Sequence, residues 1–150
     1  MSKYKSLQLA GFAPLLGMKG VRFIDIQFGP PTHIEPERDA ALKAGLPVAE
    51  RIPSLDPWQD IDGLAALMVA ADLVITVSNT NAHIAGALGV PVWNIVPKTQ
   101  GRMWFHFSGF DTSPWYPSMK LINHRWGDDM GPMVESLMLE VERLKLSAVA

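Results

Sequence analysis

The chain has 150 residues, of which 48% are hydrophobic, and a formal net charge of −2 at pH 7. This length and apolar content suffice for one domain with its own core, while the weak charge argues against a surface for nucleic acid or anionic membranes. The absence of cysteine excludes disulfides and thiolate metal sites, as expected for a cytoplasmic protein, and no apolar run approaches the roughly 20 residues that a membrane span needs.

The first half of the chain alternates candidate helices and strands. A short N-terminal helix is favoured over a signal peptide, because Gln8, two glycines and a proline interrupt the apolar segment. Residues 21–28 (V-R-F-I-D-I-Q-F) predict a strand that Gly-Pro-Pro closes. A helix at 35–44 and a short strand at 48–52 follow.

The second half continues this alternation. Apolar residues at three- and four-residue steps between 60 and 71 predict a helix with one apolar face. Residues 73–77 are a continuous apolar run typical of a strand buried on both faces, so we expect this strand at the centre of the sheet. The remaining predicted elements are a helix ended by Gly89, a strand at 92–96, a long aromatic-rich loop at 97–118, a strand at 119–123 and a helix at 128–146. The alternation predicts a single Rossmann-like, three-layer α/β domain with a mostly parallel sheet and helices on both faces.

Three polar residues, Ser78, Asn79 and Thr80, separate the strand at 73–77 from the helix that follows it. Their side-chain oxygens are well suited to accept the free N–H groups at the start of a helix. A helix N-terminus at the carboxyl end of a parallel strand favours anions, and ligands of open parallel sheets bind at that edge. The turn therefore predicts phosphate binding, and the absence of G-x-G-x-x-G after the first strand argues against a dinucleotide site.

Four segments of the chain occur in the same order in a known family. They are I-D-I-Q-F-G at 24–29, D-I-D-G-L-A-A-L at 60–67, A-D-L-V-I-T-V-S-N-T-N-A-H-I-A-G-A-L-G-V-P-V-W at 71–93 and D-T-S-P-W-Y-P-S-M-K-L at 111–121. The chain thus resembles the C-terminal, nucleotide-sugar-binding domain of GT-B glycosyltransferases, as found at the end of bacterial tetratricopeptide-repeat proteins. That group is related to the heptosyltransferases of glycosyltransferase family 9 and more distantly to O-GlcNAc transferase. The resemblance covers nearly the whole chain, so residues 1–150 are expected to form one half of a GT-B fold.

The resemblance implies a site for the diphosphate of a nucleotide-sugar donor. Its turn binds the phosphates through N–H groups and hydroxyls, a histidine in the first turns of the helix lies close to them, and a glutamine after the first strand faces the same crevice. The matching residues here are Gln27, Ser78, Asn79, Thr80, Asn81 and His83.

The chain departs from the family at two positions. Many relatives have Asp where this chain has Ser78, and Lys or Arg where it has Phe28. Lys98 and Arg102, just after the strand at 92–96, are the candidates to supply positive charge instead. Family members usually transfer sugar without a metal, so we expect no metal and no cofactor, and the catalytic residues stay unassigned.

The resemblance further implies that an N-terminal domain, or a partner chain, binds the acceptor. We expect residues 1–150 alone to bind the nucleotide diphosphate sugar and to transfer no sugar, because transfer needs a positioned acceptor and a base. Two alternatives stay open. One is a non-catalytic nucleotide-binding or pseudoenzyme module, and the other is an unrelated doubly wound domain, flavodoxin-like or epimerase-like, that shares a polar turn.

The aromatic loop at 97–118 generates a prediction about self-association. In the related enzymes this loop lies near the edge that faces the partner domain, so Trp104, Trp115 and Tyr116 are candidates for an exposed apolar patch. We expect a weak homodimer that covers this patch. Sedimentation equilibrium over a tenfold concentration range should show a mass that rises with concentration. A constant monomer mass would mean that the loop folds onto its own sheet.

Overall fold

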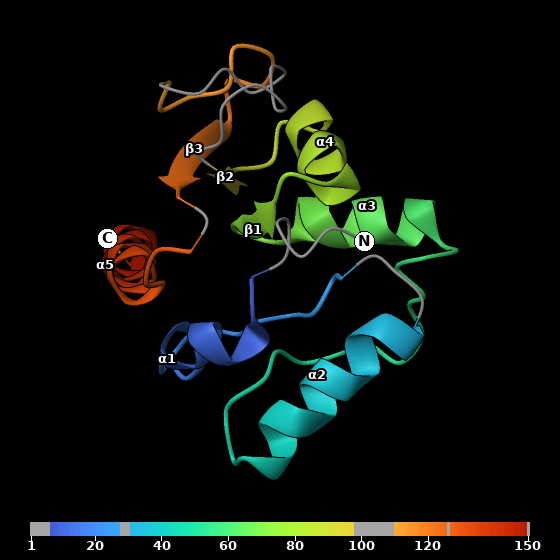
Figure 1. The fold of residues 1–150 in the computed structure, drawn as a ribbon. Coiled ribbons are helices and arrows are strands. Elements are labelled where there is room, and N and C mark those ends of the chain that lie inside the picture. The colour runs from blue at the N-terminus through green and yellow to red at the C-terminus, as the bar shows by residue number, and fades with distance from the viewer. Residues whose placement is uncertain (1–6, 28–30, 98–109, 126, 150) are drawn as a thin grey trace. The chain divides into compact units, whose positions relative to one another are not determined.

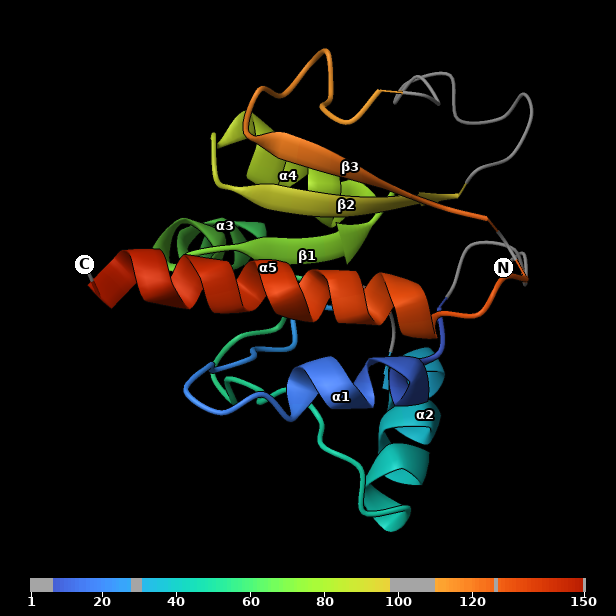
Figure 2. The same ribbon diagram turned by 90° about the vertical axis from the view of Figure 1, so that its left-hand side faces the viewer.

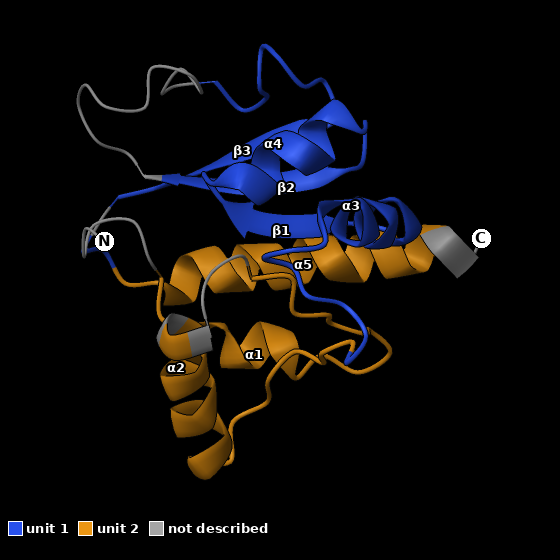
Figure 3. Ribbon diagram, turned by 90° about the vertical axis from the view of Figure 1, so that its right-hand side faces the viewer, with its two compact units in different colours: residues 1–6, 53–128 blue, residues 7–52, 129–150 orange. Residues whose placement is uncertain are grey.

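A computed structural model describes residues 7–27, 31–97, 110–125 and 127–149 (Figure 1, Figure 2). The chain divides into two compact units (Figure 3): unit 1 comprises residues 1–6 and 53–128, and unit 2 comprises residues 7–52 and 129–150. That residues 1–150 form one domain stays a prediction.

Unit 1 is an α/β unit built on a parallel sheet. Its elements are α3 (Ile61–Ala70), β1 (Val74–Val77), α4 (Thr80–Ala87), β2 (Val92–Pro97) and β3 (Met119–His124). The strands form a three-stranded sheet in the order β1-β2-β3, and both strand pairs are parallel. Helix α4 packs against β1 and β2, and α3 packs against α4, so both helices lie on the same face of the sheet (Figure 2, Figure 3). The predicted α/β class with a parallel, helix-flanked sheet is confirmed, and a helix layer on the second face stays a prediction.

The prediction that the strand at 73–77 is central is wrong for the sheet of the described residues. There β2 pairs on both sides, and β1 pairs only with β2. Burial agrees with this order, because residues 92–96 are all buried, whereas only Val74 of β1 is fully buried. An apolar, β-branched run indicates that both faces of a strand are covered, but it does not determine how many strands pair with it.

Helices α3 and α4 begin and end at the residues that local signals indicate. At the start of α3, Asp60 Oδ1 accepts a hydrogen bond from Gly63 N at 2.7 Å. At the end of α4, Gly89 has a φ of +73°, a conformation that glycine adopts without strain. The N–H groups of Gly89 and Val90 then bond to Gly86 O and Ala85 O, which is the Schellman arrangement.

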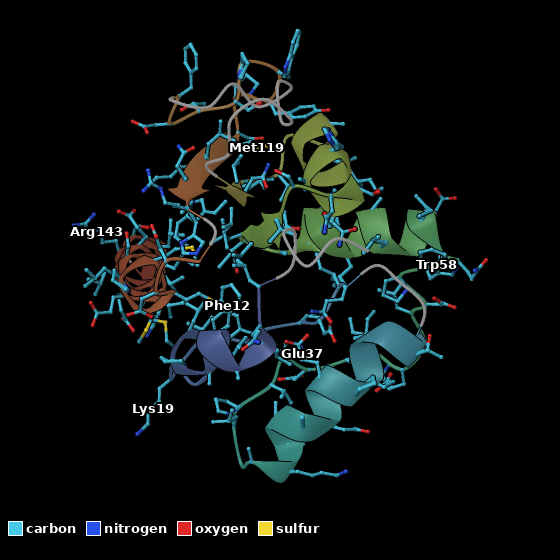
Figure 4. The ribbon with its side chains drawn as sticks, viewed as in Figure 1. Phe12, Lys19, Glu37, Trp58, Met119 and Arg143 are labelled. Atoms are coloured by element: carbon cyan, nitrogen blue, oxygen red, sulfur yellow. The ribbon has the colours of Figure 1, made fainter. Side chains whose placement is uncertain are left out.

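The core of unit 1 combines large side chains on α3 and the sheet with small ones on α4. Leu64, Val92 and Met119 are each 0% exposed, and Met119 lies at the start of β3 (Figure 4). Ala82 and Ala85 of α4 are also 0% exposed. Small residues on the buried side of α4 allow a close approach of this helix to its neighbours, which fixes the position of its N-terminus.

Unit 2 is mainly helical. Its elements are a 3-10 helix η1 (Leu9–Phe12), α1 (Ala13–Leu16), α2 (Pro31–Lys43) and α5 (Gly131–Val149). Both η1 and α1 pack against α5, and η1 also packs against α2. Glu37 of α2 accepts a hydrogen bond from Leu9 N of η1 at 2.6 Å (Figure 4).

The two strands predicted in this part, at 21–28 and 48–52, are shorter than expected. Within the described residues they reduce to one parallel bridge between Ile24 and Glu50, with Asp25 N bonded to Glu50 O and Glu50 N to Phe23 O. Most of the residues at 21–27 and at 48–52 are only half-buried or exposed. Apolar composition alone thus predicted two strands where the described residues form a single bridge.

Charged side chains join these extended segments to α2. Asp25 Oδ2 lies 3.1 Å from Arg51 Nε and 3.9 Å from Arg38 Nη1, and the Asp25 side chain is only 11% exposed. Arg38 Nη1 also donates to Ala49 O at 2.7 Å. A hydrogen bond to Glu35 raises the pKa of Arg51, and burial opposes this rise while Asp25 adds to it. The negative charge of Asp25 is therefore compensated by Arg38 of α2 and by Arg51, which follows Glu50 of the bridge.

We expect Asp25→Ala to lower the free energy of unfolding by about 2 kcal/mol, because it leaves the partly buried Arg38 without its carboxylate. Urea denaturation followed by circular dichroism measures the change. The control is Glu50→Gln, which removes an ion pair to Arg22 whose side chains are 56% and 70% exposed, and which should leave stability unchanged within error. Equal effects of the two substitutions would contradict the role given to Asp25.

Candidate functional site

The candidate phosphate site is the turn between β1 and α4 in unit 1. Asn79 is the N-cap of α4, and its Oδ1 accepts hydrogen bonds from Asn81 N at 3.0 Å and Ala82 N at 3.4 Å. The same oxygen accepts a bond from Thr76 Oγ1 at 3.2 Å. Because Oδ1 is turned toward the helix, the Nδ2 group lies on the opposite side of this exposed amide. Asn79 therefore closes the turn and can offer a hydrogen-bond donor outward.

Ser78 is connected to the interior of the sheet. Its Oγ donates to Asn94 Oδ1 at 3.4 Å, and Asn94 is 0% exposed within the central strand β2. Asn94 Nδ2 in turn donates to Met119 Sδ at 3.5 Å. This chain of polar contacts ties the turn to β2 and β3, and gives the half-buried Ser78 hydroxyl a structural role.

The next two predicted ligands differ in exposure. Thr80, the first residue of α4, is exposed, whereas Asn81 is 2% exposed. The N–H of Asn81 is already used by the cap of Asn79. The turn therefore presents Asn79 and Thr80 to the surface and directs the side chain of Asn81 inward.

His83 lies in the second turn of α4 and contacts Tyr116. Its Nδ1 is 3.2 Å from the Tyr116 hydroxyl, and the two rings meet edge to face with centroids 5.8 Å apart and planes at 70°. The Tyr116 ring lies directly over Gly86, where an added Cβ would come within 2.6 Å of Tyr116 Cγ. The segment before β3 thus packs along the outside of α4, one turn from the phosphate candidate residues.

The other predicted site residues lie in unit 2 or outside the described residues, so their place in the site stays a prediction. Gln27 belongs to unit 2, is exposed, and donates its backbone N–H to Asp25 Oδ1 at 3.0 Å. Lys98 and Arg102 lie outside the described residues, as does Trp104. Of the aromatic residues proposed as anchors, Trp115 is 52% exposed.

Sequence reasoning missed the contacts of three residues around the turn, although the resemblance implies that the S-P-W-Y-P segment at 113–117 borders the site. Asn94 is the polar residue in the otherwise apolar V-W-N-I-V segment, and this departure from pattern was an available signal. Gly86 is a glycine inside a helix, which often marks close approach of a neighbour. The pairing of Tyr116 with His83 joins residues 33 positions apart, and no local signal indicates it.

The described residues contain neither a candidate metal site nor a helix that could span a membrane. No group of three or more His, Asp or Glu side chains among them is arranged to hold a metal ion. Likewise, no helix in the described ranges is long and apolar enough to cross a membrane. The expectation that the site needs no metal stays a prediction.

The chain is similar to part of a longer protein. A stretch of 108 residues is 37% identical to Protein FlbA of Caulobacter vibrioides, which covers 71% of this chain and 17% of FlbA. The chain therefore spans less than a fifth of the length of this relative. No protein-family model and no solved structure matches the chain.

The contact between Gly86 and Tyr116 generates a stability prediction. Alanine is ordinarily the better helix former, but at position 86 its Cβ would clash with the ring, so Gly86→Ala should lower the free energy of unfolding by about 2 kcal/mol. In a Tyr116→Ala background the clash is gone, and the same substitution should raise the free energy of unfolding by up to about 1 kcal/mol. Urea unfolding of the four proteins in this double-mutant cycle measures the coupling. Additive effects would show that the ring does not rest on Gly86.

Proposed function

We propose that the chain is the donor-binding half of a GT-B-type glycosyltransferase. In this proposal the turn of residues 78–83 binds the diphosphate of a nucleotide sugar at the carboxyl end of β1. An N-terminal domain or partner chain supplies the acceptor and the general base. Unit 1 then corresponds to the Rossmann-like, nucleotide-binding part of such a domain.

The observation that carries the proposal is the β1–α4–β2 unit. Two parallel strands flank a helix whose N-terminus follows directly from the end of β1. Exposed donors gather there: the Asn79 amide and the Thr80 hydroxyl. A helix N-terminus adds roughly half a positive charge. This arrangement favours an anion with several oxygens over a neutral ligand.

In the proposed reaction, this site stabilises the leaving group. When the sugar departs, negative charge grows on the nucleoside diphosphate. Fixed N–H and O–H donors together with the helix dipole stabilise that charge most when they are already in place. In the described turn, the cap bonds hold the Asn79 side chain, and with it the outward amide group, in position before any ligand binds.

A non-catalytic nucleotide-binding module is the second candidate. It fits the same turn, since Ser78, Asn79, Thr80 and Asn81 carry hydroxyls and amides that do not ionise near neutral pH. Such groups bind phosphate but do not accept a proton from an attacking hydroxyl. The two candidates predict the same binding, and they differ in whether sugar is transferred once an acceptor domain is present.

Asn79→Asp tests the binding site without disturbing the turn. Asp is as good an N-cap as Asn, so the cap should persist and stability should stay equal or rise slightly through the helix dipole. The outward amide group, however, becomes an anionic oxygen that repels phosphate. We expect the wild-type chain to bind UDP, GDP or ADP, and Asn79→Asp to weaken that binding by about tenfold or more in titration calorimetry.

The matched control is Gln59→Glu, which introduces the same negative charge at an exposed residue before α3. It should leave the affinity unchanged. If the control weakens binding as much as Asn79→Asp does, the effect comes from net charge and the diphosphate does not bind at the turn. If the wild-type chain binds none of the three diphosphates at millimolar concentration, the proposed function fails.

A further inference from the structure

Helix α3 is apolar on both its buried and its exposed side. Leu64 and Met68 face the core of unit 1, and they are 0% and 1% exposed. On the outer side, Ile61 is 43% exposed and Val69 is 60% exposed. A helix that is apolar all round is ordinarily buried all round. The outer side of α3 therefore presents to solvent a surface that is suited to contact with another protein.

The exposed apolar residues of α3 form a stripe along the helix. Ile61, Ala65 and Val69 follow one another at steps of four residues, so they lie on the same side. Trp58, labelled in Figure 4, is 42% exposed and lies just before the helix begins. The small side chain of Ala65 between two larger ones gives an uneven surface, of the kind against which a second helix packs.

The charges around this stripe all have the same sign. Residues 52–97 contain four aspartates and no lysine, arginine or glutamate. All four are exposed and lie within or beside α3: Asp56, Asp60, Asp62 and Asp72. No ion pair between described residues involves any of these carboxylates. The α3 surface thus combines an apolar stripe with negative charge that no cation of the same segment balances.

This charge pattern indicates which kind of partner fits the surface. A second copy of the chain in contact through the same face would bring two sets of aspartates together without a cation between them. An anionic lipid surface would be repelled for the same reason. A helix that carries an apolar stripe flanked by lysine or arginine is complementary in both respects. Its apolar side chains would cover Ile61 and Val69, and its cations would lie near the aspartates.

We propose that the exposed side of α3 is a docking surface for a basic amphipathic helix of a partner protein. Ile61 and Val69 contact the apolar side of that helix, and Asp62, in the first turn of α3, contacts its cations. This inference does not depend on nucleotide binding at the turn of residues 78–83, so each can fail without the other.

A synthetic helical peptide of leucine and lysine, with the two residue types on opposite faces, is the probe. Fluorescence anisotropy of the labelled peptide measures its dissociation constant for the wild-type chain, and we expect saturable binding. A peptide with glutamate in place of lysine should bind at least about tenfold more weakly, because it is repelled by the aspartates. A peptide with alanine in place of leucine should also bind at least about tenfold more weakly, because it buries less apolar surface.

Val69→Lys locates the binding surface. Position 69 is exposed and lysine is a good helix former, so the unfolding midpoint should not fall. We expect this variant to raise the dissociation constant of the leucine–lysine peptide by about tenfold, because it removes an apolar contact and repels the lysines. The matched control is Leu139→Lys, which adds the same charge at a residue of α5 that is 64% exposed, and it should change the constant less than about twofold. Asp62→Asn should raise the constant by about threefold.

Three results with the peptides would overturn the inference: no saturable binding, equal binding of the lysine and glutamate peptides, or equal effects of Val69→Lys and Leu139→Lys. Sedimentation equilibrium tests the alternative occupant. We expect Val69→Lys to sediment with the same mass as the wild-type chain at each concentration. If the wild-type chain self-associates and Val69→Lys abolishes this, a second copy occupies the α3 surface and the inference is wrong.

Discussion

In the turn between β1 and α4, a single amide oxygen, Oδ1 of Asn79, accepts hydrogen bonds from Asn81 N, Ala82 N and Thr76 Oγ1. The first four N–H groups of any helix lack partners within the helix, and this oxygen satisfies two of them while linking the helix to β1. The same bonds compete with an anion for those two N–H groups. In the proposed function, a diphosphate would therefore bind mainly to side-chain donors that the cap has oriented, and less to a row of vacant backbone N–H groups.

Local signals predicted the elements around this turn well. Asp60 begins α3, Asn79 begins α4, and Gly89 ends α4 with a positive φ, each as its residue type indicates. Strands β2 and β3 lie where their apolar runs predict them. These features depend on residues within one or two helical turns of each other, or on the composition of a single strand. These features can therefore be predicted from the local sequence.

Pairing between distant segments was predicted less well. The strand at 73–77 proved to be at the edge of the described sheet, and the strands at 21–28 and 48–52 reduced to one bridge at Ile24 and Glu50. Which strands lie side by side depends on packing against the rest of the fold, and β-branched composition does not specify it. The candidate site shows the same division: the capping residues were recognised, whereas Asn94 and Tyr116 reach the turn only through strand register and loop packing.

The two interactions that the sequence did not indicate have a common consequence for the turn. Asn94, in the central strand β2, accepts a hydrogen bond from Ser78. Tyr116, in the segment before β3, contacts His83 on the outer side of α4. Each fixes a polar side chain beside the N-terminus of α4, which is itself fixed by Asn79. Side chains held on several sides lose little conformational entropy when a ligand binds. The same rigidity stabilises the fold whether or not a ligand binds. Large-to-small substitutions here would therefore change both stability and binding, and only near-isosteric changes such as Asn to Asp or Tyr to Phe separate the two effects.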